Sequence, residues 1–395
     1  MQFGSPARHL SRRFTVSIAV AVWGMLLLLS LAVVPSTLAF SFPTTTFGVG
    51  NSPNAVAINP ANNKVYVVEN ADSNVTVVDG SSNTGVVNVT VGTNPSAVAV
   101  NPSSGNVYVT NQDDNNVAVI DGSNKFVTNI SVGTNPVAVA VNSATNKVYV
   151  VNTGDNNVAV IDGATNTVTG NITVGNSPDA IAINNKTGTL YVVNGADNTV
   201  AVVDGASGVV TANVSVGDSP QAIALNPGTG LLYVANNVDN TVSVLQASSN
   251  TVLLNVSVGT APAAVAVDPH DNLVFVANSG DGTVSVINGQ TNGVVANVTV
   301  GNTPSGVAYD SANGKIYVAN SGDNTVSVIS VSTSIISTTT TPTSGQTTTP
   351  TGVTSSGGGG GGIPEFPVQV GVTLLVTVAM VATFVLARRA NQQRQ

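Results

Sequence analysis

The chain has 395 residues, of which 42% are hydrophobic and 8% are charged, and its formal net charge is −8. It contains no cysteine and two histidines, His9 and His270, which excludes disulfides and thiol chemistry and leaves little for histidine-based triads or metal sites. Residues 42–330 contain 17 aspartates, one glutamate, five lysines and no arginine, so they carry 13 net negative charges, which argues against a nucleic-acid partner.

The N-terminal segment has the features of a secretory signal peptide. Arginines between residues 8 and 13 precede an uncharged apolar run over residues 14–34, and Thr37 and Ala39 suit the minus-three and minus-one cleavage positions. We therefore predict a signal peptide over residues 1–39. An uncleaved membrane anchor is the alternative, because the run is long enough to span a bilayer.

A repeat of about 42 residues fills residues 42–330. Each period has four short apolar runs separated by Gly, Asn, Asp, Pro and Ser, which predicts four strands and four turns. The dipeptide Val-Gly marks the period at Val49, Val91, Val132, Val174, Val216, Val258 and Val300. Four-stranded units of about 40 to 45 residues are typical of propeller blades, whereas β-helix coils are shorter. The sequence therefore predicts an all-β fold, a seven-bladed β-propeller.

The second repeat illustrates the predicted strand order. Residues 97–100 (AVAV) are expected innermost, followed outward by 106–111 (NVYVTN), 116–121 (NVAVID) and 126–132 (FVTNISV). The second strand carries one aromatic residue per repeat, and we expect these residues to pack between blades: Tyr66, Tyr108, Tyr149, Tyr191, Tyr233, Phe275 and Tyr317.

The ends of the array predict how the ring closes. The chain enters at residues 42–49 with the equivalent of a fourth strand and leaves near Ser330 after three strands of the last repeat. We expect the first segment to complete the last blade, which removes free sheet edges.

One aspartate per repeat is predicted to lie in the turn between the second and third strands. These residues are Asp72, Asp114, Asp155, Asp197, Asp239, Asp281 and Asp323. On one face of the ring, together with the Gly-x-x-Pro turns, their carboxylates could bind Ca²⁺ through oxygen ligands. We favour ordinary turn chemistry copied by duplication, because Asp followed by Asn or Gly favours turns, and we therefore predict no metal site.

The repeats contain eight N-glycosylation sequons. They lie at Asn74, Asn88, Asn129, Asn171, Asn185, Asn213, Asn255 and Asn297. Six of them share one phase on the predicted outermost strand, where alternation turns Asn and Thr toward solvent. We expect modification there, although Asn and Thr are abundant and the copies are not independent.

The C-terminal region is predicted to be a stalk followed by a membrane helix. Residues 331–362 are rich in Ser, Thr, Pro and Gly, which is typical of an O-glycosylated stalk or of a bare flexible linker. Residues 368–387 carry no charge and are long enough to cross a bilayer, and Arg388, Arg389 and Arg394 follow them. These arginines predict a cytoplasmic C-terminus and an external propeller.

The second-strand motif resembles the YVTN-family β-propeller repeat. The resemblance rests on NVYVTN at 106–111, KVYVVN at 147–152 and LLYVAN at 231–236, with recurring Gly-x-x-Pro and Asp-Gly turns, and it covers about residues 42–330. The first repeat departs from the pattern, with Glu69 in place of Asn. The resemblance implies a seven-bladed surface protein, often archaeal and similar to surface-layer proteins, without a defined activity.

The last 33 residues resemble the archaeal PEF-CTERM sorting signal. The resemblance rests on Pro364, Glu365, Phe366 and Pro367, followed by the apolar segment and the arginines. It implies that a membrane sortase-like enzyme removes the tail. A plain transmembrane anchor is the alternative.

These observations favour an extracellular, membrane-anchored recognition module of the cell envelope, similar to adhesion or surface-layer proteins. We expect envelope proteins or glycans as partners, no cofactor and no catalysis, and we expect His270 to be a solvated turn residue. The alternative is a lactonase-like hydrolase or quinoprotein-like oxidoreductase with its site at the channel mouth. Such a site would concentrate polar residues on particular blades, whereas the repeats are nearly interchangeable.

Overall fold

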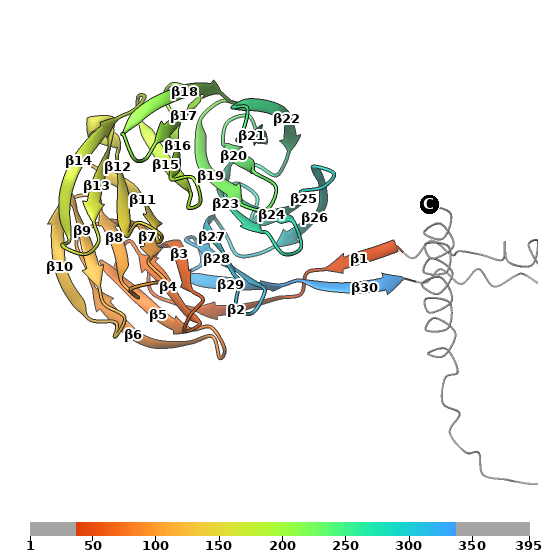
Figure 1. Cartoon of the computed structure of the whole chain (residues 1–395). Coiled ribbons are helices and arrows are strands. Elements are labelled where there is room, and N and C mark those ends of the chain that lie inside the picture. Colours follow the sequence, from red (N-terminus) through yellow and green to blue (C-terminus); the bar gives the residue numbers. More distant parts are fainter. Residues whose placement is uncertain (1–36, 337–395) are drawn as a thin grey trace, which may run out of the picture. The chain divides into compact units, whose positions relative to one another are not determined.

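The seven repeats fold into seven four-stranded antiparallel sheets around a common axis (Figure 1). The computed structural model describes residues 37–336. It confirms the predicted all-β, seven-bladed propeller. The predicted signal-peptide core at 14–34, the stalk beyond residue 336 and the helix at 368–387 lie outside the described residues. Within residues 37–336, no helix has the length and apolar character needed to cross a membrane.

In every blade the strands follow the chain from the axis to the rim, except for the outermost strand of the seventh. The innermost strands are β3 (Pro53–Asn59), β7 (Pro95–Val100), β11 (Pro136–Asn142), β15 (Pro178–Asn184), β19 (Pro220–Asn226), β23 (Pro262–Asp268) and β27 (Pro304–Asp310). The second strands are β4 (Lys64–Glu69), β8 (Val107–Asn111), β12 (Lys147–Asn152), β16 (Thr189–Asn194), β20 (Leu231–Asn236), β24 (Leu273–Asn278) and β28 (Lys315–Asn320).

The two outer layers complete each blade. The third strands are β5 (Asn74–Asp79), β9 (Asn116–Ile120), β13 (Asn157–Asp162), β17 (Thr199–Asp204), β21 (Thr241–Gln246), β25 (Thr283–Asn288) and β29 (Thr325–Ser330). The outermost strands are β2 (Thr44–Gly48), β6 (Thr84–Thr90), β10 (Phe126–Ser131), β14 (Thr167–Thr173), β18 (Val209–Ser215), β22 (Thr251–Ser257) and β26 (Gly293–Thr299). One short 3-10 helix, η1 (Thr153–Asp155), lies in a turn.

The ring closes as predicted. β2 pairs with β29 and completes the sheet formed by β27 and β28, with Phe47 opposite Val326. A further backbone hydrogen bond joins the first and last repeats next to this strand pair: the Val49 N–H donates to the Asn324 carbonyl at 3.0 Å. The N-terminal strand therefore covers an edge that β29 would otherwise expose.

Strand pairing continues past the predicted ends of the propeller at 42 and 330. β1 (Thr37–Ser41) pairs antiparallel with β30 (Ser332–Ile336), and the two strands leave the ring side by side (Figure 1). β1 spans the predicted cleavage position after Ala39, and β30 lies in the predicted stalk. The pairing follows from closure, because β2 and β29 are neighbours and bring the adjoining segments together.

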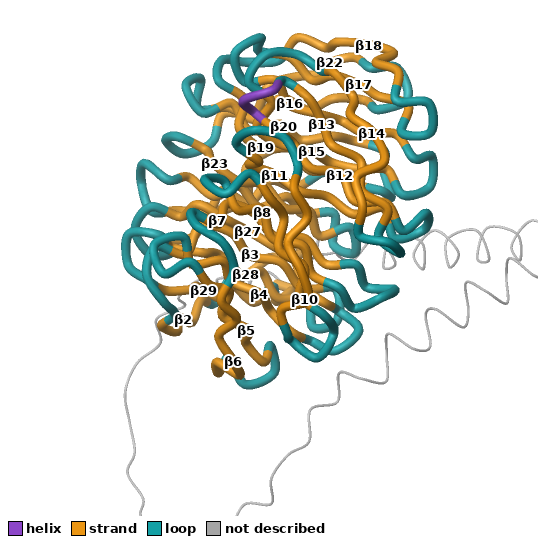
Figure 2. The backbone as a smooth tube through the Cα atoms, turned by 90° about the vertical axis from the view of Figure 1, so that its left-hand side faces the viewer, coloured by secondary structure: helices purple, strands orange, loops and turns teal. Residues whose placement is uncertain are grey.

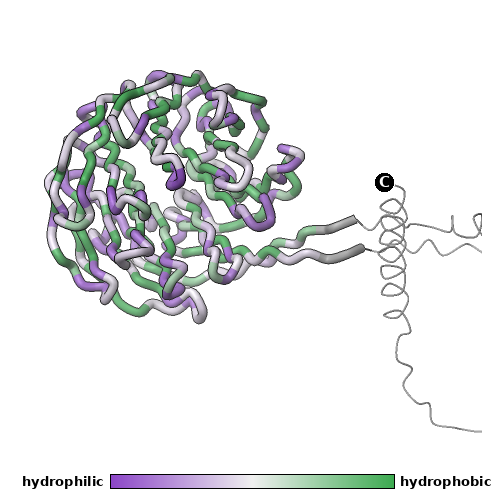
Figure 3. The backbone as a smooth tube through the Cα atoms, viewed as in Figure 1, coloured by the Kyte–Doolittle hydropathy of each residue, from purple (hydrophilic) through white to green (hydrophobic). Residues whose placement is uncertain are grey.

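The core lies between neighbouring blades. Side chains of the second and third strands are almost all buried, which explains their continuous apolar runs. Figure 3 shows hydrophobic stretches along the backbone of the propeller, interrupted by hydrophilic residues. The predicted role of the aromatic residues is confirmed: Tyr66 packs with Val107 and Val109 of the next blade, and Tyr66, Tyr108, Tyr233, Phe275 and Tyr317 are fully buried. Loops and turns gather on two opposite faces of the ring (Figure 2).

Candidate functional site

The seven predicted turn aspartates lie on the same face as the Gly-x-x-Pro loops. Each carboxylate accepts a hydrogen bond from the backbone N–H of the residue 21 positions earlier, at 2.6 to 2.9 Å. The donors are Asn51, Thr93, Thr134, Asn176, Asp218, Thr260 and Asn302. These bonds lower the pKa of Asp72 and of Asp197, with the backbone N–H as the main cause.

Each aspartate therefore binds the loop that leads into its own blade. Among residues 37–336, no three Asp, Glu or His side chains come together in an arrangement that would hold a metal ion. A Ca²⁺ ring formed by the seven aspartates stays the less favoured alternative. The geometry shows that these carboxylates position the loops of this face, which we call the loop face.

Two further contacts hold the loop face. The glycine of each Val-Gly pair packs against the turn, and Gly92 donates its N–H to buried Asn111 Oδ1 at 3.0 Å. In each Gly-x-x-Pro loop the residue before the proline has a positive φ, from 49° at β-branched Thr303 to 58° at Asn135. Turn asparagines of the preceding blade hold several of these residues, for example Asn240, whose Oδ1 accepts from the Ala261 N–H at 2.7 Å.

The residue that follows the proline of each Gly-x-x-Pro loop differs between blades. Asn54 and Ser96 donate from this position to the proline carbonyl of the next blade, at 3.1 and 2.9 Å. Blade 4, counted along the chain and formed by β15 to β18, has Asp179 at this position. The Asp179 carboxylate lies beside Gly195, where a side chain at residue 195 would otherwise lie. Burial raises the pKa of Asp179 to about 6. This carboxyl therefore titrates between its usual range and neutrality.

A second departure lies on the opposite face, on blades 6 and 7. Tyr309 occupies a position that is aliphatic in the other repeats, and buried Asp268 and Asp310 replace the asparagine that usually ends the innermost strand. Burial first, then the negative charges led by Asp268, raises the pKa of Tyr309 to about 12. His270 lies in the adjacent turn, where its side chain is 84% exposed and contacts Asp271 at 2.9 Å, as expected of a solvated residue.

The sequons fall into two structural groups. Asn88, Asn129, Asn171, Asn213, Asn255 and Asn297 are exposed on the outermost strands, and Asn185 is exposed in a turn. Asn74 differs, because it begins the third strand of blade 1 and its side-chain Oδ1 is buried. Because the first seven asparagines are exposed, a glycosylating enzyme can reach them on the folded protein.

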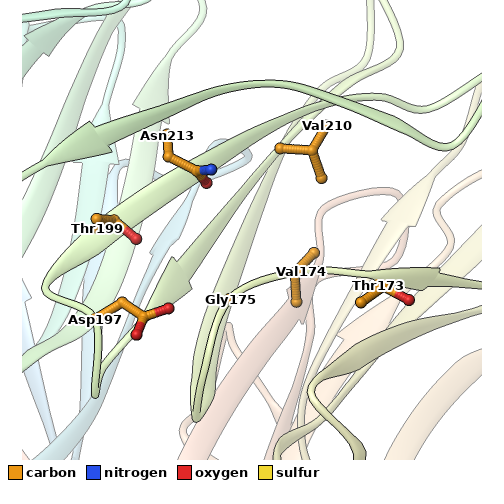
Figure 4. A pocket seen from close by; sticks show the side chains of 7 residues that line it. All are labelled: Thr173, Val174, Gly175, Asp197, Thr199, Val210 and Asn213. Atoms are coloured by element: carbon orange, nitrogen blue, oxygen red, sulfur yellow. The ribbon is translucent and has the colours of Figure 1, made fainter.

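A groove lies between blades 3 and 4. Its volume is about 320 Å³, and Figure 4 shows Asp197, Thr199 and Asn213 on one side and Thr173 and Val174 on the other. Gly175 and Val210 complete the lining. The groove is partly open to solvent, and its residues belong to the repeated pattern rather than to a departure from it.

Comparisons with known proteins agree with the fold. The profile of the family described as "Lactonase, 7-bladed beta-propeller" matches residues 200–307, and the NHL repeat matches residues 302–329. The chain is a β-propeller repeat protein. None of the curated proteins compared matches it.

The fold is widespread among solved structures, of which 1525 chains match. One of them is hydrazine synthase from Kuenenia stuttgartiensis, with a TM-score of 0.64 and 20% identity, over 72% of this chain and 96% of the other. Identity this low shows the fold alone.

Sequence reasoning placed the aspartate ring and the sequons but missed the residues that break the symmetry. Asp179 and Tyr309 were visible in the sequence as departures from their repeat positions. The sequence shows Glu69 as a departure from asparagine, and the fold shows that it is buried. Aligning the seven repeats column by column is the signal that finds all three.

Proposed function

We propose that the protein is a non-catalytic recognition module of the cell envelope that binds envelope proteins or glycans through its loop face. One observation carries this proposal. The loop face repeats one exposed arrangement seven times, in which an Asp carboxylate holds a loop that presents Asn, Thr or Asp. Repeated hydroxyl, amide and carboxylate groups suit a polar partner bound at several points. The carboxylates serve loop geometry and do not converge as catalytic groups do.

An external location is part of the proposal. It rests on the predicted signal peptide, on the helix predicted at 368–387 and on the exposed sequons of the outermost strands. Those strands also expose Val86, Phe126 and Leu253, in the same strands as Asn88, Asn129 and Asn255. Oligosaccharides at these asparagines would cover the apolar side chains. We further propose that the PEF-CTERM-like tail is processed by a sortase-like enzyme.

Introduced cysteines test the proposal cleanly, because the chain has none of its own. Thr93→Cys lies on the loop face and Ser82→Cys on the opposite face, and both positions are exposed. We expect a membrane-impermeant maleimide to label both variants on intact cells. A bulky polyethylene-glycol maleimide should block binding to envelope fragments only at position 93. Absence of labelling would reject the external location, and equal binding after both modifications would reject the loop face.

A lactone hydrolase is the second candidate. It is favoured by the profile match over residues 200–307 and by the polar departures of blades 6 and 7, where Tyr309 and Asp268 lie. Hydrolysis of simple lactones by the wild type, lost in Tyr309→Phe with folding intact, would support it. No turnover above the uncatalysed rate would remove it.

A further inference from the structure

Blade 1 has an acceptor where the other six blades have a donor. In blades 2 to 7 an asparagine ends the second strand, and its Nδ2 donates to the first side chain of the third strand, for example from Asn111 to Asn116 Oδ1 at 2.6 Å. The same bond joins Asn152 to Asn157 at 2.8 Å. In blade 1 the corresponding pair is Glu69 and Asn74. A carboxylate has no N–H, so this bond cannot form.

Two oxygen atoms of this pair have no hydrogen-bond partner. Asn152, Asn236, Asn278 and Asn320 also have a buried oxygen without a partner at the position of Glu69, but in blade 1 that oxygen belongs to a carboxylate. Glu69 is fully buried, and its Oε1 accepts from the Gly50 N–H at 2.6 Å and from the Thr76 hydroxyl. Its Oε2 is buried without any hydrogen bond, and so is Oδ1 of Asn74. Burying a carboxylate oxygen in this way is costly unless a donor or a cation faces it.

A third oxygen borders the same space. A Cβ added to Gly50 would lie under 3.0 Å from both Glu69 Oε2 and Asp72 Oδ2. Asp72 is exposed and is held in place by the Asn51 N–H at 2.7 Å, so the space in front of Gly50 reaches solvent on that side. In the other blades the same position faces an asparagine amide instead of a second carboxylate.

We propose that Glu69, Asp72 and Asn74 bind a divalent cation of the Ca²⁺ type in front of Gly50. Two carboxylates and an amide carbonyl are hard oxygen ligands, and Ca²⁺ takes about six to eight such ligands with water among them. The cation supplies the positive charge that buried Glu69 lacks. Only blade 1 has this set, so the stoichiometry is one ion per chain.

The site lies at the junction that closes the ring. Residues 49–52 connect β2 to β3, and Asn324 of the last blade binds this loop through its Oδ1, which accepts from the Ser52 N–H at 2.9 Å. Asn324 also donates from Nδ2 to Asn51 Oδ1 at 3.3 Å. A cation bound to Glu69 and Asp72 therefore holds the segment that fastens β2 to the ring.

The test uses the full chain, stripped with a chelator and then titrated with Ca²⁺ in a calorimeter and in thermal melts. We expect one bound ion and a rise in Tm. Glu69→Asn restores the asparagine of the other six blades, so it should lose the Ca²⁺ response while melting in chelator at or above the wild type. This behaviour separates a lost ligand from a damaged fold.

Equivalent aspartates of two blades provide the matched control. Asp72→Asn should weaken the Ca²⁺ response, whereas Asp114→Asn should leave it intact, because Asn111 stands beside Asp114 in place of a glutamate. A wild-type Tm that ignores Ca²⁺ overturns the proposal. A response retained by Glu69→Asn, or lost equally in Asp114→Asn, assigns the ion elsewhere and also overturns it.

Discussion

At the scale of single residues, the glycine of each Val-Gly pair is required by the side chains packed against it. A Cβ on Gly92 would lie under 3.0 Å from Asp114 Oδ2 and from the Asn111 side chain, whereas a Cβ on Gly170 would meet nothing within 4 Å. We expect Gly92→Ala to cost about 1–3 kcal/mol by overpacking and Gly170→Ala to be neutral. Urea unfolding of both variants measures the difference, and equal effects would contradict it.

Asp179 and Asp197 should respond to pH in opposite directions. The pKa of Asp179 is about 6 in the folded chain, above its ordinary value of 3.8, so ionisation opposes folding as pH rises through this range. The free energy of unfolding of Asp179→Asn should therefore match that of the wild type near pH 4. Above pH 6 it should be larger by about 1–2 kcal/mol, after allowance for the partial solvation of the carboxyl.

Asp197 is the control for this measurement. Its pKa is lowered, so its contribution is present above the unfolded pKa and is lost as pH falls through the folded value. Asp197→Asn should be less stable than the wild type at neutral pH, with a gap that closes in acid. Thermal melts from pH 3 to pH 8 measure the Tm difference between each variant and the wild type. Differences that do not change with pH would refute the two pKa shifts.

At the scale of elements, the tyrosines of the second strands differ in what their hydroxyls reach. The Tyr317 hydroxyl donates to the Gly80 carbonyl of the next blade at 3.0 Å, whereas the Tyr233 hydroxyl is buried without a partner. Tyr317→Phe should lower the free energy of unfolding by about 1 kcal/mol, whereas Tyr233→Phe should leave it unchanged or raise it, and urea unfolding measures both. Blade 6 already has Phe275 at this position. A larger loss in Tyr233→Phe would show that packing outweighs the hydrogen bond.

The outermost strands and the third strand of blade 1 should differ in glycosylation. We expect sugar on Asn88, Asn129, Asn171, Asn213, Asn255 and Asn297, which are exposed. Asn74 should stay bare, because its amide oxygen is buried beside Glu69. Glycopeptide mass spectrometry of protein from its native envelope reads each site. Occupancy at Asn74 equal to that at Asn88 would contradict exposure as the deciding factor.

The repeated pattern predicted the elements well because every signal occurs seven times. Four apolar runs per period gave the strand order, and the count of strands at each end gave the pairing of β2 with β29. The hydrogen bond from Asn51 to Asp72 was not predictable, because it joins residues 21 apart whose proximity depends on the folded turn. The orphaned oxygens of Glu69 and Asn74 were missed for the same reason: burial of a single departure is a tertiary property.

At the scale of the whole molecule, stability depends on the closing strand. Deleting residues 42–49 would expose the edge of β29, including Val326 and Val328, which are now buried. We expect a lower Tm for the whole ring and partial recovery when a synthetic peptide of residues 42–49 is added. Replacing β30 with Gly and Ser residues is the control, because β30 pairs only with β1. An unchanged Tm after the deletion would reject this closure.

The same junction makes the molecule mechanically unequal at its two ends. A pull on the C-terminal side passes from β30 into β29, which has β28 on one side and β2 on the other. A pull on the N-terminal side passes from β1 into β2, which has β29 as its single partner. Tension applied from the C-terminal side must therefore shear two rows of hydrogen bonds at once, so a propeller tethered there resists drag better than one tethered by its first strand.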